Sequence, residues 1–98
     1  MESKIEKLSR FASKHFGIEE KKLYSASRGS QITLARHFVW YYLHKELNVS
    51  IGTLSKEFFR SKRAVFKGIS NIGWMINNQR IYKDMYSNFT EEYKKATP

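Results

Sequence analysis

The chain has 98 residues, 41% hydrophobic and 15% aromatic, a composition that supports one folded domain over residues 1–98, excludes extensive disorder and leaves little room for a second domain. The absence of cysteine excludes a disulfide framework and a thiolate metal site. Eighteen Lys and Arg against nine Asp and Glu give a net charge of +9, which favours a polyanionic partner, although many basic domains bind nothing acidic.

Helical periodicity begins close to the N-terminus, and the alternating pattern typical of β-strands is weak throughout. The first apolar stripe consists of Ile5, Leu8, Ala12 and Phe16. It predicts a helix from about Ser3 to His15 that Gly17 ends, followed by a short helical turn over residues 18–23. We therefore expect an all-α fold from the start of the chain.

A basic loop and a long helix follow. From Tyr24 to Ser30 the residues are small and polar, which predicts a surface loop with Arg28 at its centre and Ser30 as the next N-cap. The next apolar stripe consists of Ile32, Ala35, Phe38, Val39, Tyr42, Leu43 and Leu47. It predicts a central helix over residues 31–47, against which the others pack, ended by residues 48–49.

A helix-turn-helix is predicted after this break. Ser50 is a candidate N-cap for a short helix, and Ser61 is a candidate N-cap for a longer one over residues 61–77. The apolar positions of the two helices are Ile51, Leu54 and Phe58, and then Val65, Ile69, Ile72 and Ile76. A last amphipathic segment predicts a closing helix from about Arg80 to Lys94, giving a compact bundle of about five or six helices.

The longer helix carries the side chains expected to contact DNA. At about 25 Å it fits the major groove, where Lys62 and Arg63 in its first turn can meet a phosphate or a guanine edge. Between Phe58 and Lys83 the chain holds six basic residues and no acidic one, which strengthens the case for nucleic acid. The expected contact residues of this region are Arg60, Ser61, Lys62, Arg63, Lys67, Ser70 and Asn71.

The aromatic residues allow more than one interpretation. Phe66 lies near the polar face of the longer helix, where it can touch a thymine methyl group or turn into the core, and the core is favoured. Helical spacing favours a core position for the run from Trp40 to Tyr42 over stacking on bases. We interpret Trp40 and Trp74 as packing residues or as a partner surface.

The order of these features resembles the C-terminal DNA-binding domain of the bacterial replication initiator DnaA, over nearly the whole chain. The matching stretches are residues 23–28, Leu34-Ala35-Arg36-His37, Ser50-Ile51-Gly52-Thr53-Leu54-Ser55-Lys56-Glu57-Phe58, and residues 61–72. The resemblance implies that Arg28, eight residues before Arg36, enters the minor groove. It leaves two roles open for Arg36, a phosphate contact or a pair with a neighbouring acid.

The recognition helix departs from that family. The family's Gly-Gly-x-Asp-His-Thr-Thr-Val is replaced by Phe59-Arg60-Ser61-Lys62-Arg63-Ala64-Val65, with one residue fewer in the turn. Because the Asp-His-Thr run reads bases in the family, we expect DNA binding with a different sequence preference or with little preference. No phosphate-binding Gly-x-x-x-x-Gly-Lys-Ser/Thr loop occurs in these residues, so we expect this chain not to carry the family's ATPase activity.

Other functional classes have little support. A metal site is not indicated, because no Cys or suitably spaced carboxylate accompanies His15, His37 and His44. An enzyme or a cofactor is not indicated either, because the sequence suggests no convergent carboxylates and no nucleophile with a nearby base. No apolar run is long enough to cross a bilayer, so we expect a soluble intracellular protein. The resemblance to the DnaA domain implies the bacterial cytoplasm and nucleoid as its location.

The expected partner is double-stranded DNA, in a regulator of replication or transcription. The first alternative is a protein-interaction module, with a replication or regulatory protein as partner, that kept the fold and lost base readout. The second alternative is a basic surface for anionic lipid headgroups.

Overall fold

The computed structural model describes residues 3–25 and 29–96, and these residues form six α-helices and no β-strand. In chain order the helices are α1 (Lys4–Phe16), α2 (Glu20–Tyr24), α3 (Ser30–Lys45), α4 (Ile51–Glu57), α5 (Lys62–Asn78) and α6 (Arg80–Ala96). The prediction of an all-α bundle is confirmed, and the predicted helix ends lie within two residues of the observed ones.

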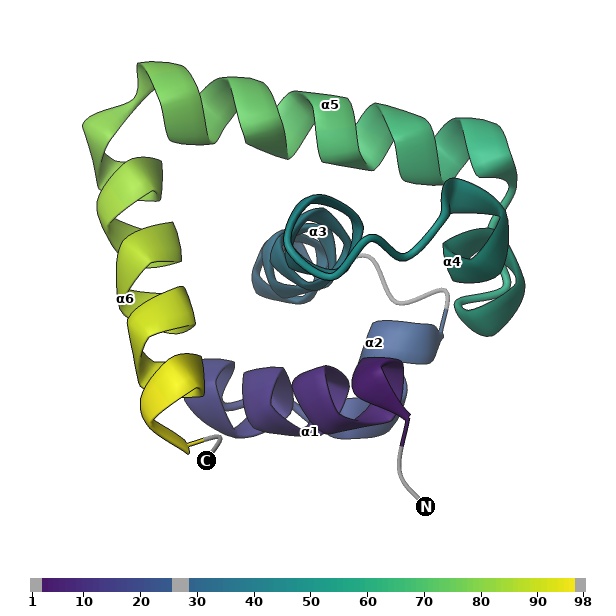
Figure 1. Ribbon diagram of the computed structural model, residues 1–98, viewed down its shortest axis with the longest axis horizontal. Helices are drawn as coiled ribbons and strands as arrows, with labels where there is room; N and C mark the ends of the chain where they lie inside the picture. Colours follow the sequence, from purple (N-terminus) through teal and green to yellow (C-terminus); the bar gives the residue numbers. More distant parts are fainter. Residues whose placement is uncertain (1–2, 26–28, 97–98) are drawn as a thin grey trace.

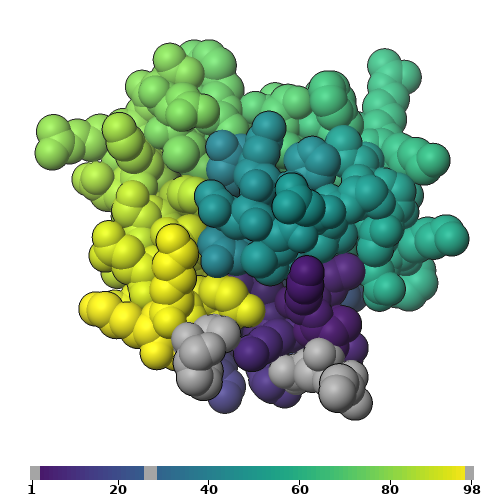
Figure 2. All heavy atoms as spheres, in the orientation of Figure 1, coloured from purple at the N-terminus to yellow at the C-terminus, as the bar shows by residue number. Residues whose placement is uncertain are grey.

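Helix α3 runs through the middle of the bundle. In Figure 1 it is seen end-on at the centre, with α5 above it, α6 at the left, α1 and α2 below and α4 at the right. Its buried residues are Ala35, Arg36, Phe38, Val39, Trp40, Tyr42 and Leu43. They surround most of the helix because neighbouring helices pack against several of its sides. Side chains fill the spaces between the ribbons on the face shown in Figure 2.

Serine side chains begin three of the helices. Ser3 and Glu6 form a reciprocal capping box at the start of α1. Ser50 and Ser61 each accept a hydrogen bond, at 3.1 Å, from the backbone N–H three residues farther on. These bonds satisfy N–H groups that have no partner within the helix, and they confirm both predicted caps of the helix-turn-helix.

Glycines lie at two other helix ends. Gly17 ends α1 in the left-handed conformation, with φ of 68°, as the sequence predicts. The prediction that Ser30 caps α3 is wrong, because Ser30 is the first helical residue and Gly29 occupies the N-cap without a side-chain bond. Helix α3 therefore begins one residue earlier than expected.

Aromatic rings join α1, α3 and α6. The ring centroid of Phe89 in α6 lies 5.7 Å from Phe11, 5.4 Å from Phe16 and 6.2 Å from Phe38. Contacts at these distances add attraction to the burial of apolar area. Helix α6 thus closes the side of the bundle that α4 and α5 leave open.

Candidate nucleic-acid interface

The turn between α4 and α5 is held by a buried ring and by bonds back to α4. Phe58 is fully buried, and the Arg60 N–H donates to the Ser55 carbonyl at 3.0 Å. The Ser55 hydroxyl in turn donates to the Arg60 carbonyl. Ser61 then caps α5, so the path of the chain into α5 is set by local bonds.

Phe59 is the unusual residue of this turn. Its φ is 55°, in the left-handed region, and 79% of its surface is exposed. A bulky residue in this conformation is uncommon and strained. The turn therefore keeps a conformation that suits glycine, although its sequence does not contain one.

The inner side of α5 packs closely on α3. Its buried residues are Val65, Gly68, Ile69, Ile72, Gly73 and Ile76, which confirms the predicted apolar stripe. A methyl group added at Gly68 would lie 2.9 Å from His37 Nε2, and one added at Gly73 would lie 3.0 Å from the Tyr41 ring. The two glycines therefore let α5 approach the aromatic side of α3.

The outer side of α5 holds six of the residues predicted to contact DNA, all of them exposed. These are Ser61, Lys62, Arg63, Lys67, Ser70 and Asn71. Residues three and four apart share a helix face, so Arg63, Lys67 and Ser70 lie along one line. The first turn of α5 contains no acidic residue, and both the N-terminal N–H groups of a helix and basic side chains favour a negatively charged group. Long side chains project outward over α4 and α5 in Figure 2.

Two aromatic residues also lie on the outer side of α5. Phe66 and Trp74 are each 59% exposed. The prediction that Phe66 turns into the core is therefore wrong, because Val65 and Ile69 beside it already fill the contact with α3. Of the two tryptophans, Trp40 is buried in α3 as a packing residue and Trp74 is on the surface.

Arg36 is a core residue and does not fit the phosphate contact considered for it. It is only 4% exposed. Its Nε donates to the Leu23 carbonyl at 2.9 Å, and its Nη2 donates to the carbonyls of Lys22 and Ser25 at 2.8 and 3.0 Å. Burial, and then the nearby charge of Arg60, lower the pKa of Arg36. The guanidinium thus holds the end of α2 against α3 instead of facing solvent.

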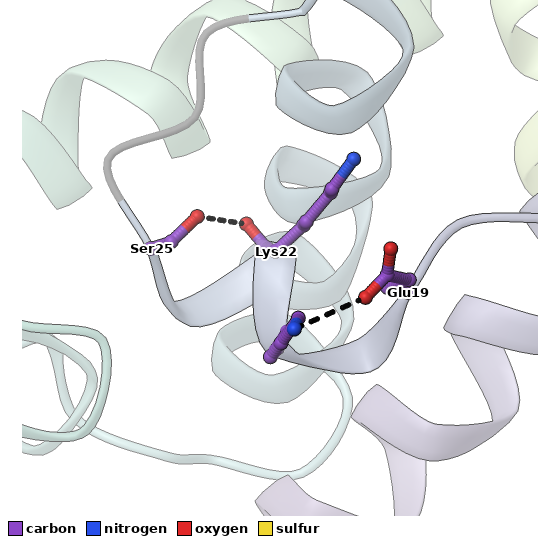
Figure 3. Close-up of polar contacts among 4 residues, drawn as sticks. Glu19, Lys22 and Ser25 are labelled. Atoms are coloured by element: carbon purple, nitrogen blue, oxygen red, sulfur yellow. Dashed lines mark hydrogen bonds and ion pairs between the residues drawn. The ribbon is translucent and has the colours of Figure 1, made fainter.

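Arg60 also donates a hydrogen bond to the Ser25 carbonyl. Its Nη2 donates to the Ser25 oxygen at 2.6 Å, and its side chain is partly buried. Two guanidinium groups, one from α3 and one from the turn, therefore meet at Ser25. The Ser25 hydroxyl also donates to the Lys22 carbonyl, as Figure 3 shows. Arg60 is better described as an anchor than as an exposed DNA contact.

Ser25, to which both arginines bond, lies close in the sequence to Arg28 of the predicted basic loop. Arg28, three residues after Ser25, lies outside the described residues. The ring of Tyr24 stacks on Phe58 at 4.7 Å between centroids, which adds a second link from α2 to the turn. The described first residues of the predicted loop, Tyr24 and Ser25, are thus held to the helix-turn-helix by this ring pair and by the Arg60 bond.

His37 is a residue of α3 that faces α5 near Gly68. Its ring stacks on Trp40 at 5.4 Å between centroids. Burial, and then the charge of Arg36, lower the pKa of His37 to about 4, so the ring is neutral at neutral pH. Among the described residues no group of three His, Cys, Asp or Glu side chains is arranged to hold a metal ion.

The two capped helices, their tight turn and the exposed basic face define a helix-turn-helix DNA-binding domain. A family model described as the bacterial dnaA protein helix-turn-helix matches residues 5–72, and the chain belongs to that family. The match runs from α1 into α5 and ends before α6. No curated protein matches the sequence. Within the described ranges no helix is long and apolar enough to span a membrane.

Proposed function

We propose that this domain binds double-stranded DNA by placing the first half of α5 in the major groove and Arg28 in the minor groove. The outer face of α5 is the observation that carries this proposal, because Arg63, Lys67 and Ser70 are exposed along one line. Arg pairs bidentately with guanine in the major groove, and Lys contacts phosphate. The anchoring of Ser25 to the turn supports a joint action of the loop and α5.

The departures from the family's motif bear on what α5 reads. Ser61, Lys62, Arg63 and Ala64 stand here in place of the family's Asp-His-Thr-Thr. We propose that the domain has a new sequence preference or little preference, and that it acts in the bacterial nucleoid as a regulator of replication or transcription. Selection from a random duplex pool tests specificity, because one enriched motif indicates base readout and no enrichment indicates backbone binding.

Binding to duplex DNA at several salt concentrations tests the proposal itself. Arg63→Ala should weaken binding by about 1–3 kcal/mol if Arg63 contacts a base, and Lys67→Ala should lower the salt slope by about one if Lys67 contacts a phosphate. Lys14→Ala is the matched control, because it removes an exposed charge from α1, on the opposite side of α3 in Figure 1. A folded protein that binds no duplex at low salt contradicts the proposal.

A protein partner is the second candidate, and one observation favours it. Trp74 at the end of α5 and Ile81 at the start of α6 are both more than half exposed. Exposed large apolar side chains can mark a contact with another protein. A partner captured equally well by the Arg28→Ala, Arg63→Ala double variant, and no longer captured by Trp74→Ala, would support this candidate, whose partner would be a replication or regulatory protein.

A further inference from the structure

Phe66 is an apolar residue in the middle of a cationic surface. It follows Arg63 by three residues and precedes Ser70 by four, so all three share one face of α5. Lys67 is its neighbour in sequence, and no acidic residue occurs between Phe58 and Lys83. The ring is 59% exposed, so it is open to solvent beside the two basic side chains.

The packing of the bundle does not account for this ring. Val65 and Ile69, its neighbours on the inner side, are almost fully buried and make the contact with α3. Phe66 instead borders a surface hollow of about 340 Å³ whose wall also includes His44, Lys45 and Ser70. Tyr41, Ile51 and Ile69 also line this hollow, but the exposed neighbours of Phe66 along α5, Arg63 and Lys67, are basic. This charge pattern favours an anionic occupant over a second apolar protein surface.

We infer that Phe66 contacts the C5-methyl group of thymine in the major groove, and that it thereby contributes to sequence preference. The inference rests on the proposed binding of α5 to duplex DNA. The thymine methyl group is the one apolar group that base pairs present in that groove, and Phe is among the side chains that contact it. Arg63 and Lys67 bring the helix to the groove, and Phe66 lies one turn from Arg63 on the same face.

Trp74 provides a matched control on the same helix. It has the same exposed fraction as Phe66 and lies on the same side of α5. It is eight residues farther along, which is about 12 Å of helix length and about 16 Å from Arg63. Trp74 therefore lies in the second half of α5, outside the half that is proposed to enter the major groove.

The experiment compares one mixed-sequence duplex with the same duplex in which deoxyuridine replaces every thymidine, since deoxyuridine lacks only the methyl group. The wild-type protein should bind the deoxyuridine duplex about fourfold more weakly for each thymine methyl group that the Phe66 ring touches. Phe66→Ala should bind both duplexes equally. Trp74→Ala should keep the wild-type ratio, and Phe66→Leu should keep part of it because an apolar side chain remains.

The outcomes separate this inference from the proposed function. Equal binding of both duplexes by the wild type, or a ratio that survives Phe66→Ala, overturns the thymine contact and leaves duplex binding in place. Failure of the folded wild-type protein to bind either duplex at low salt overturns the proposed function and this inference with it. All three variants change exposed side chains, and helical circular dichroism confirms that they fold.

Discussion

The inner and outer sides of α5 differ in the size, charge and exposure of their side chains. The inner side uses small residues, Gly68 and Gly73, so that the rings of α3 can approach its backbone. The outer side carries Arg63, Phe66 and Lys67, and all three are exposed. The inner side therefore sets where the helix lies, and the outer side sets what it can bind. Substitutions on the inner side should change the free energy of unfolding, and those on the outer side should change affinity.

Arg36 and Arg63 show the same difference between a buried and an exposed position. The Arg36 guanidinium is buried and donates to three backbone carbonyls, whereas Arg63 is on the surface. A positive charge is thus used inside the bundle to tie α2 to α3 and outside it to meet an anion. Residue type alone does not separate these roles, but the stability of single variants does.

The largest effect is expected at Arg36. Arg36→Ala removes three hydrogen bonds to backbone carbonyls and the packing of a buried side chain, and the free energy of unfolding should fall by about 2–4 kcal/mol. Arg63→Ala is the matched control and should change it by less than about 0.5 kcal/mol. Urea unfolding of the two variants measures both values, and similar losses in stability would contradict the assignment of Arg36 to the core.

The next effect concerns the contact between α5 and α3. Gly68→Ala places a methyl group against the ring of His37, and the free energy of unfolding should fall by about 1–3 kcal/mol. Gly52→Ala is the control, because its methyl group would meet its nearest neighbour at 3.6 Å, an ordinary contact. Because Gly52 lies within a helix, Gly52→Ala should raise the free energy of unfolding by up to about 1 kcal/mol. Thermal and urea unfolding should therefore give changes of opposite sign.

The neutral state of His37 makes the inner side sensitive to acid. Its pKa of about 4 in the fold lies below the usual value of 6.5, so the unfolded chain binds a proton first as the pH falls. The contribution of His37 to the free energy of unfolding is full well above pH 6.5, and about 1–2 kcal/mol of it should be lost as the pH falls from about 7 to about 5.

Urea unfolding at each pH measures this loss. The loss should disappear in His37→Gln and remain in His15→Gln, which retains His37. An unchanged loss in His37→Gln would show that another group is responsible.

The smallest effect is expected at Phe59. Phe59→Gly removes the strain of the left-handed backbone, which stabilises the folded state by about 1–2 kcal/mol. Glycine also makes the unfolded chain more flexible, which destabilises the folded state by about 0.5–1 kcal/mol. The free energy of unfolding should rise by a few tenths of a kcal/mol to about 1 kcal/mol. A rise in melting temperature supports this account, and a fall would mean that the Phe59 ring makes contacts that stabilise the turn.

Local sequence determined most of the helices and their ends. Ser3, Ser50 and Ser61 bond to N–H groups three residues away, and Gly17 adopts a conformation that its lack of a side chain permits. Interactions of this kind depend on a few consecutive residues, so they can be recognised without knowing the fold. The apolar stripe of α5 was predictable for the same reason, and with it the exposed line through Arg63.

Tertiary structure decided the roles of Arg36, Arg60 and Phe66. Helix α3 is surrounded by its neighbours, so its sequence has no polar side that would mark Arg36 as either exposed or buried. The partner that Arg36 and Arg60 share, the Ser25 carbonyl, lies 11 and 35 residues away from them. Phe66 follows the buried Val65 by one residue, about 100° around the helix, where periodicity favours neither side. The ring of Phe66 is on the surface because Val65 and Ile69 occupy the contact between α5 and α3.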